Sequence, residues 1–414
     1  MGDGDEGACL STGPAEGFFV CERCFEDDTL KALVRQNVSE TECNFCGRRS
    51  RRRPVAAPLD RIIEVINEAI DREYDLAANN LGYESAEGGY YGKHWDTYDL
   101  LTDQIELELP NDDGTLFEII RSCVGDEVWC ERNPYSLRQD EKLIYSWEHF
   151  CEFIKYERRY FFLSAAKDDN EIFDPSELLP IIGSTVEDCG LIRTIAKGSL
   201  IYRARQFAVG EILKTSYDLA PPPKENATRS NRMSPAGIVM FYASDDPQTA
   251  AAEIDDKPSL GISIGTFRIT RDILVLDLTR LPRRPAFFEN HYGYDRYAVS
   301  FLHEFVRSMA ARVEPGNREH VDYVPTQVVT EWFRTAFKHA DTSIDGIYYP
   351  SAQMKAGTSL VLFAERDRLV LNKRELREET NEKEPYEVWG FSERQENAWL
   401  RLVRVRVMRQ PTGS

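Results

Sequence analysis

The stretch MFYASDDPQTAAAEI, residues 240–254, joins the pattern of a β-strand to the pattern of a helix. It begins with three apolar residues, breaks at the polar turn Ser-Asp-Asp-Pro (244–247) and continues as an alanine-rich segment that carries Glu253. The proline at the start of this segment and the alanines within it favour a short helix. We expect Glu253 on the inner face of that helix, where small apolar residues indicate close packing. A carboxylate in such a place needs a partner or a function.

Strand-like and helix-like segments continue on both sides of this stretch, over residues 186–405. Short β-rich runs occur in SLIYRARQ, GIVMFYAS, SIGTFRIT, ILVLDLT, DGIYYPSA and SLVLFAE. Helical patterns lie between them, around 246–254, 295–312 and 324–340. This mixture predicts one domain with a mixed α/β fold.

The region before this domain has a different pattern of apolar and polar residues. Amphipathic patterns such as DRIIEVINEAIDREY and GTLFEIIRSCV predict an all-helical domain over residues 57–185. Residues 1–16 are rich in Gly, Asp and Glu, so we expect a disordered tail there. Residues 406–414 are expected to form a second tail. The predicted fold class is therefore α+β, with a helical domain in front of the mixed α/β domain.

Four of the nine cysteines form two close pairs, in CERC (Cys21 and Cys24) and in CNFC (Cys43 and Cys46). Two such pairs at this separation are typical of a zinc site, because two turns can each present two thiolates to a tetrahedral ion. Four thiolates close the coordination shell, so we interpret the Zn²⁺ as structural. The alternative is four free thiols. The predicted zinc unit, together with a basic linker, spans residues 17–56.

Composition and charge limit the classes of function. The chain has 414 residues and a formal net charge of −19. Such an acidic chain is repelled by phosphate backbones, which disfavours nucleic acid as a partner. We therefore interpret the basic linker RRSRRRP (48–54) as a solvated spacer. No segment has the length and apolarity of a membrane span, and the N-terminus lacks the apolar core of a secretion signal. We expect a cytoplasmic protein that does not bind membranes.

Three polar residues lie at or near the ends of predicted strands in the C-terminal domain. Arg203 lies in LIYRAR, Glu253 closes the opening stretch, and Ser351 lies in DGIYYPSAQ. Functional groups commonly sit where strands end in loops. Each residue alone is also consistent with an ordinary role: a surface ion pair, a solvated helix residue or a turn.

Together, these residues and the segments around them resemble the RES domain, of which Arg, Glu and Ser in these contexts are defining residues. The flanking segments are NRMSPAGIVMFYASDDPQTAAAEI (231–254), YVPTQVVTEWFR (323–334) and DGIYYPSAQMKAGTSLVLF (345–363). The resemblance covers about 186–405. It implies a fold similar to ADP-ribosyltransferases, NAD as the substrate and, as in many members, a role as the toxin of a toxin–antitoxin pair. The region before it resembles the HEPN-like N-terminal domain that accompanies some RES domains.

The resemblance implies a catalytic group of Arg203, Glu253 and Ser351. Cleavage of the nicotinamide–ribose bond creates an oxocarbenium ion, and a carboxylate such as Glu253 stabilises that charge. Arg203 presents a rigid fork of N–H donors to the pyrophosphate or to ribose hydroxyls. Ser351 is expected to hydrogen-bond the nicotinamide amide or a ribose hydroxyl.

Three further residues are expected to contact NAD. Arg232, in NRMSP, is a second candidate for binding the pyrophosphate. Tyr202 and Tyr242 are candidates for stacking on the nicotinamide or shaping its pocket. Their alternative role is packing in the core, since tyrosine is intermediate in burial.

The leading functional hypothesis is an enzyme that cleaves NAD as a glycohydrolase, or as a phosphorylase if phosphate replaces water. The resemblance makes it a toxin or defence effector that depletes NAD. The first alternative is an ADP-ribosyltransferase acting on a macromolecule, because the same oxocarbenium ion serves every acceptor. The second is a non-catalytic binding or sensor module that uses the zinc unit. An antitoxin or regulatory protein is the expected partner, and a homo-oligomer is left open.

Overall fold

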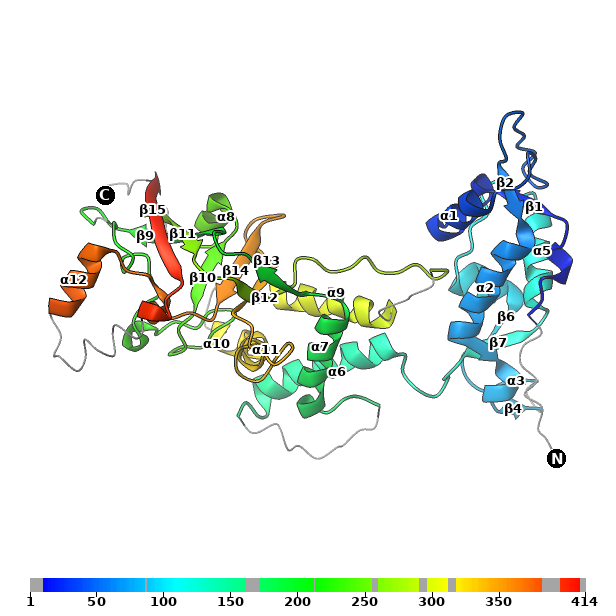
Figure 1. Cartoon of the computed structure of the whole chain (residues 1–414). Coiled ribbons are helices and arrows are strands. Elements are labelled where there is room, and N and C mark those ends of the chain that lie inside the picture. The colour runs from blue at the N-terminus through cyan, green and yellow to red at the C-terminus, as the bar shows by residue number, and fades with distance from the viewer. Residues whose placement is uncertain are drawn as a thin grey trace. The chain divides into compact units, whose positions relative to one another are not determined.

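The computed structural model describes residues 10–85, 88–160, 171–211, 213–254, 260–289, 296–311, 318–381 and 395–409. The chain divides into two compact units (Figure 1). The first unit comprises Met1–Arg138 and Arg284–Tyr292, and the second comprises Gln139–Arg283 and Gly293–Ser414. The first unit therefore includes a short segment from the second half of the sequence. Among the described helices, none has the length and apolarity to span a bilayer.

The first unit is mainly helical and also contains short strands. Its elements, in chain order, are η1 (Gly13–Ala15), β1 (Phe19–Cys21), η2 (Glu22–Cys24), α1 (Asp28–Asn37), β2 (Ala56–Pro58), α2 (Leu59–Glu73), β3 (Tyr74–Leu76), α3 (Ala77–Asn80), β4 (Tyr83–Glu84), β5 (Gly89–Tyr90), β6 (Trp95–Asp96), α4 (Thr97–Asp99), η3 (Leu100–Gln104), α5 (Thr115–Val124) and β7 (Val128–Glu131). Strands β3, β7 and β6 form a small antiparallel sheet. The region is therefore not all-helical as we expected, because strands this short leave no readable alternation in the sequence.

One hydrophobic core joins the cysteine pairs to the helices of the first unit. Helix α2 buries Ile62, Ile66 and Ile70 on one face, at the spacing of an amphipathic helix. Cys21 and Cys24 belong to the same buried cluster as that face. The predicted zinc unit is therefore part of this core and does not form a separate module.

The start of the first unit differs from the tail expected at residues 1–16. Gly13–Ala15 form a 3₁₀ turn, and the side chain of Ala15 is fully buried. The backbone N–H of Ser11 donates to the carbonyl of Cys123 on α5 at 2.9 Å. Residues 10–16 are therefore anchored to the unit, while residues 1–9 lie outside the described part of the chain.

The second unit contains a large sheet with helices. Its elements, in chain order, are α6 (Gln139–Tyr156), α7 (Pro175–Asp188), β8 (Ile192–Ile195), β9 (Leu200–Phe207), η4 (Lys224–Asn226), β10 (Phe241–Ser244), α8 (Pro247–Ala252), β11 (Gly261–Ile269), β12 (Ile273–Asp277), α9 (Arg296–Ala310), α10 (Glu319–Asp322), α11 (Val324–Thr335), β13 (Gly346–Pro350), β14 (Thr358–Leu362), η5 (Arg366–Arg368), α12 (Lys373–Asn381) and β15 (Leu400–Arg409). The sheet has eight strands in the order β15-β11-β9-β10-β14-β13-β12-β8. Only the β12–β13 pair is parallel among these neighbours.

Two hydrophobic clusters pack against this sheet. Helices α6, α7, α9 and α11 gather near strands β12 and β13 (Figure 1) and form one buried cluster with Leu276 of β12 and Ile347 of β13. A second cluster contains Phe241 of β10, Phe267 of β11 and Trp399 just before β15. Because neighbouring residues of a strand point to opposite faces, these clusters cover both faces of the sheet.

The second unit begins earlier than we expected. Helix α6 contributes Trp147 and Phe150, and α7 contributes Leu178 and Ile182, to the same cluster as α9 and α11. We expected both segments in the N-terminal domain, because apolar periodicity predicts a helix and does not identify its packing partner. At the C-terminus, β15 extends to Arg409, so part of the expected tail at 406–414 belongs to the sheet.

The sheet opens between strands β9 and β10. These strands share one registered pair, Ser244 with Tyr202, whereas β9 pairs with β11 from Leu200 to Phe207. Strand β10 pairs along its whole length with β14 on its other side. Strands β9 and β10 therefore diverge, and side chains and backbone groups of both strands become accessible at this point.

Candidate functional site

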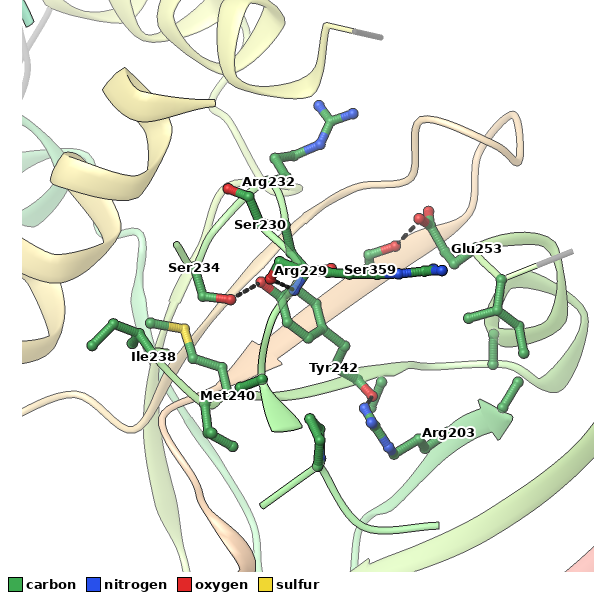
Figure 2. Close-up of a pocket in the computed structure, with 18 of the residues that line it drawn as sticks. Arg203, Arg229, Ser230, Arg232, Ser234, Ile238, Met240, Tyr242, Glu253 and Ser359 are labelled. Atoms are coloured by element: carbon green, nitrogen blue, oxygen red, sulfur yellow. Dashed lines mark hydrogen bonds between the residues drawn. The ribbon is translucent and has the colours of Figure 1, made fainter. Parts of the chain in front are cut away.

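A cavity of about 610 Å³ lies where β9 and β10 diverge (Figure 2). Its volume lies within the usual range of small-molecule sites. It is lined by Tyr202, Arg203, Ala204, Pro222, Asn226, Ala227, Thr228, Arg229, Ser230, Asn231, Arg232, Ser234, Ile238, Val239, Met240, Tyr242, Ala243, Ser244, Ala250, Glu253, Ile254, Glu319, Tyr323, Tyr349, Gln353 and Ser359. Five of the six NAD-site residues predicted from the sequence are in this lining, and the sixth, Ser351, bonds to one of them.

Glu253 follows the last residue of α8, and two serine hydroxyls donate to the same oxygen of its carboxylate. Ser351 Oγ lies 2.5 Å from Glu253 Oε1, and Ser359 Oγ lies 2.9 Å from it. Figure 2 shows the Ser359 hydroxyl pointing at Glu253 from the neighbouring strand β14. Within the described residues no hydrogen bond is assigned to Oε2, and Glu253 is exposed. One oxygen therefore anchors the carboxylate while the other remains accessible.

The loop between β13 and β14 brings Ser351 to Glu253. The backbone N–H of Ser351 donates to the Gly357 carbonyl at 2.9 Å and closes the loop. The Ser351 hydroxyl oxygen accepts from the backbone N–H groups of Gln353 and Met354, at 3.2 and 3.0 Å. With its hydrogen donated to Glu253, this hydroxyl has three partners and a single orientation.

Gly357 allows the same loop to approach α8 closely. A Cβ at this position would lie 2.7 Å from Thr249 Oγ1 and 2.9 Å from Met354 Cβ. Both distances are too short for real atoms, so any larger residue would push the loop away from the helix. The close approach keeps Ser351 within reach of Glu253.

Two expectations about this region change. Ser351 is not in the cavity lining, and its hydroxyl positions Glu253, so it does not present a free donor to nicotinamide. The position of Glu253 also differs from the expected one: Ala250 and Ala251 are buried against Ile262 and Ile264 of β11. They pack the helix on the sheet, and Glu253 lies beyond them on its exposed end rather than on its inner face.

Arg203 crosses the opening of the sheet. Its Nε donates to the Leu219 carbonyl at 2.8 Å and its Nη1 donates to the Tyr242 carbonyl at 2.7 Å. Its guanidinium also lies over the ring of Phe241, 5.0 Å from the centroid. Burial, together with the charge of Arg205, lowers the pKa of Arg203 to about 10, so it stays charged at neutral pH. This side chain therefore links β9 to β10. An arginine has five N–H donors, so three remain on a residue that lines the cavity.

Residues 228–234 form a cavity wall that carries two more arginines. Arg229 is exposed and extends in the direction of Glu253, whereas the guanidinium of Arg232 points the other way (Figure 2). Arg232 Nη1 donates to the Met309 carbonyl at 2.7 Å, and its guanidinium lies 5.8 Å from the centroid of the Tyr323 ring. The cavity therefore has guanidinium groups on two sides, Arg203 on the sheet and Arg229 with Arg232 on this wall.

The cavity tyrosines both line the site and pack into the unit. The Tyr242 hydroxyl lies 2.9 Å from Ser234 Oγ, and burial raises the pKa of Tyr242 to about 12. Tyr202 packs beside Ala204 and α8. Burial likewise raises the pKa of Tyr349 well above its ordinary range. The phenols of Tyr242 and Tyr349 are therefore neutral at physiological pH and present apolar rings and hydroxyl groups to the cavity.

Several lining residues were not identified from the sequence: Arg229, Ser234, Glu319, Tyr323, Tyr349 and Ser359. Ser359 could have been identified as the polar residue that begins the otherwise apolar run SLVLF. A signal also existed for Arg229, which lies three residues before Arg232 in a polar segment. Glu319 of α10 and Tyr323, the residue after this helix, had no local signal, because tertiary packing brings them to the cavity.

The four cysteines of the two pairs lie together in the first unit. Their sulfur atoms are all within 4.8 Å of one another. The Cys21–Cys24, Cys24–Cys43 and Cys21–Cys46 sulfur distances are 4.0, 3.6 and 3.4 Å. A tetrahedron with Zn–S bonds of about 2.3 Å requires sulfur atoms ~3.8 Å apart. The arrangement fits a tetrahedral metal ion with four thiolate ligands.

Local contacts support this arrangement of cysteines. Glu22, between the first pair, accepts from Arg48 at 3.2 Å and also from Arg35 of α1. Gly47, directly after the second pair, has a φ of +68°, which favours glycine and lets the chain turn sharply there. The cluster is largely buried, so it has the closed character of a structural site.

Comparison with protein families identifies both parts of the chain. A model of the RES domain matches residues 201–386, and a model of the HEPN/RES N-terminal domain 1 matches residues 36–168. No curated protein and no solved structure was found to match. The part of the chain that holds the cavity is thus a RES domain, a family associated with NAD-related toxin activity. The chain thus carries a HEPN/RES N-terminal domain 1 followed by a RES domain.

Proposed function

We propose that the protein cleaves the nicotinamide–ribose bond of NAD in the cavity between β9 and β10. The observation that carries this proposal is the pair of serine hydroxyls on Glu253 Oε1, which leaves Oε2 accessible beside the cavity. A carboxylate held in this way is suited to stabilise a positive charge that develops on a substrate. Arginines on two sides of the cavity are suited to a substrate with a pyrophosphate.

In this proposal, the arginines bind and orient NAD. Arg203 offers its remaining N–H donors from a guanidinium fixed by two backbone carbonyls. Arg229 offers a second guanidinium from the opposite wall. Pyrophosphate oxygens accept charge-assisted hydrogen bonds from such groups, and fixed donors lose little freedom on binding. The phenols of Tyr202 and Tyr242 line the space for the flat nicotinamide ring.

Bond cleavage then requires little acid–base chemistry. The C1′–N bond breaks, its electron pair stays with the ring nitrogen, and nicotinamide leaves as a neutral molecule. The ribose becomes an oxocarbenium ion, whose positive charge lies beside Glu253 Oε2. Water adds to C1′ and releases a proton, which yields ADP-ribose. If phosphate adds instead, the enzyme is a phosphorylase.

The molecule that accepts the ADP-ribosyl group distinguishes this proposal from the alternatives. An ADP-ribosyltransferase would pass the same ribose to a nucleophile on a macromolecule, and a binding module would leave NAD intact. Incubating the purified full chain with NAD, and separating free ADP-ribose, ADP-ribose phosphate and labelled macromolecule, identifies the acceptor. We expect free nicotinamide and a small-molecule ADP-ribose product. Label found only on protein or nucleic acid would favour the transferase.

Removing either serine should slow cleavage to a limited extent. We expect Ser351→Ala and Ser359→Ala each to lower kcat about fivefold, since one hydrogen bond is typically worth ~1 kcal/mol. Steady-state kinetics with NAD measure this effect. Ser244→Ala serves as the matched control, because Ser244 is a buried cavity serine whose hydroxyl is not bonded to Glu253. Equal activity of all three variants would remove the serines from the mechanism.

We further propose that the four-cysteine cluster holds a structural Zn²⁺. The observation that supports it is the spacing of the sulfur atoms, which fits a tetrahedral ion. The ion would link the chain segment at β1 to the turn before β2 and stabilise the first unit. We also propose that the protein acts as a toxin. An antitoxin or regulatory protein would control its activity through the first unit.

Loss of one cysteine should remove the metal and destabilise the first unit. We expect about one Zn²⁺ per chain in the purified protein and much less in Cys43→Ser, because a mononuclear site needs all four ligands. Elemental analysis measures the metal, and thermal unfolding measures the stability. Cys130→Ser is the matched control, since Cys130 is also buried in the first unit but lies outside the cluster. Metal-free wild-type protein would contradict the proposed site.

A further inference from the structure

Helix α11 carries a buried polar face that contacts the arginine-bearing wall of the cavity. Three of its residues are polar although they are buried: Thr326, Gln327 and Thr330 are 7, 6 and 0% exposed. They lie in the segment VPTQVVTEWFRT, at positions that share one face of a helix. Buried polar side chains are costly unless they are hydrogen-bonded, so their partners reveal what this face does.

Gln327 and Thr326 hydrogen-bond to the segment 230–233, and Thr330 contacts it. The Gln327 amide nitrogen donates to Ser230 Oγ at 2.8 Å and to the Asn231 carbonyl at 2.7 Å. Thr326 Oγ1 donates to the Arg232 carbonyl at 2.6 Å. Thr330 Oγ1 lies 3.2 Å from the sulfur of Met233. The helix therefore contacts four consecutive residues of the wall.

Gln327 is the central contact of this set. It uses both of its amide hydrogens on Ser230 and Asn231, which lie between Arg229 and Arg232. The same short segment is closed on itself, because Asn231 N donates to Ser234 O at 2.8 Å. Gln327 itself is not in the cavity lining, so any effect on a bound ligand must pass through the segment that it holds.

We propose that Gln327 is a positioning residue, which fixes Arg229 for the pyrophosphate of NAD and thereby sets the affinity for the substrate. This inference rests on the proposed function. The wall that Gln327 holds carries guanidinium groups, whereas Glu253 is held separately by Ser351 and Ser359. Loss of Gln327 should therefore weaken binding while the carboxylate keeps its place. The expected signature is a raised KM with a nearly unchanged kcat.

The first test compares Gln327→Met with Glu331→Ala. Methionine keeps the length and volume of glutamine and removes both donors, whereas Glu331 is an exposed residue one turn further along the same helix. We expect Gln327→Met to raise KM for NAD about tenfold with kcat within about twofold of wild type, since two neutral hydrogen bonds are lost. Glu331→Ala should match the wild type. Equal KM values for both variants, or a loss confined to kcat, would overturn the inference.

A binding measurement separates this effect from catalysis. In the Glu253→Gln background, calorimetry should show a weaker Kd for NAD when Gln327→Met is added, by the same factor as the change in KM. Ser230→Ala provides a second variant that leaves α11 intact, and it should raise KM by a few-fold. If Gln327→Met fails to fold, an unchanged KM in Ser230→Ala overturns the inference.

A double-mutant cycle tests whether Gln327 changes KM through Arg229. Because Gln327 is expected to act through Arg229, Gln327→Met should raise KM less in an Arg229→Ala background than in the wild type. Full additivity would overturn the inference and leave the proposed function standing. Absence of NAD turnover in the wild-type protein is a different result, since it removes the proposed function and this inference with it.

Discussion

Glu253→Gln should lower kcat for NAD cleavage by about 10²–10³, the usual loss for one preorganised electrostatic group. Glutamine keeps an oxygen that can accept from Ser351 and Ser359, so the side chain should stay in place. Only the negative charge at the position of Oε2 is lost. That charge matters most when the ribose becomes cationic, so the loss should appear in kcat while the affinity for NAD stays close to normal.

The control for this variant is Glu319→Gln, which neutralises the second carboxylate of the same cavity. Glu319 is at the start of α10, and neither of the serines that hold Glu253 bonds to it. We expect a much smaller effect on kcat from this change. Product release is measured by chromatography, and binding is measured by calorimetry. If a correctly folded Glu253→Gln protein retained full turnover, Glu253 would have no part in the chemistry.

Arg203→Ala should raise KM for NAD by about 10- to 100-fold, because a hydrogen bond to a charged group is worth ~1.5–3 kcal/mol. The change also removes the donors for the Leu219 and Tyr242 carbonyls, which join the two sides of the opening in the sheet. We therefore expect a lower melting temperature as well. Steady-state kinetics and thermal unfolding measure the two effects independently.

Two further variants separate binding from folding at this position. Arg203→Lys keeps the charge but cannot reproduce the fork of donors, so it should restore the affinity only in part. Arg205→Ala removes an exposed arginine from the same strand, whose Nη1 bonds to the Asp218 carbonyl at 2.6 Å. It should leave KM unchanged. An unchanged KM in Arg203→Ala would place this side chain outside the binding site.

The strands that carry the site could be predicted from the sequence because their apolar runs are short and bounded by polar turns. LIYRAR corresponds to β9, MFYAS to β10 and SLVL to β14. Strand β15 was not among the predicted strands, and its last four residues fall in the tail that we expected at 406–414. Helices α6 and α7 fall within the residues 57–185 that we expected to form the N-terminal domain, whereas both pack in the second compact unit. Periodicity describes one element at a time, whereas unit boundaries depend on contacts between elements.

The site itself could be predicted only in part. Arg203 and Glu253 were identified from the sequence and both lie at the cavity. The role of Ser351 could not be derived, because its contact with Glu253 spans 98 residues of sequence. Ser359 was missed for a related reason: its register beside β10 brings it to Glu253, and register is not visible in a single run of residues. Gln327 lies in the segment YVPTQVVTEWFR, but nothing in that segment points to its partners, which lie 96 and 97 residues away.

The central claim is that this chain consumes NAD through Glu253, and one measurement tests it most directly. The purified full-length protein and its Glu253→Gln variant are incubated with NAD, and nicotinamide and the ADP-ribose product are quantified over time. The account predicts that wild type releases one nicotinamide for each NAD consumed, over many turnovers, and that the variant is slower by about 10²–10³. Intact NAD after incubation with folded wild type, or equal rates for the two proteins, would contradict it.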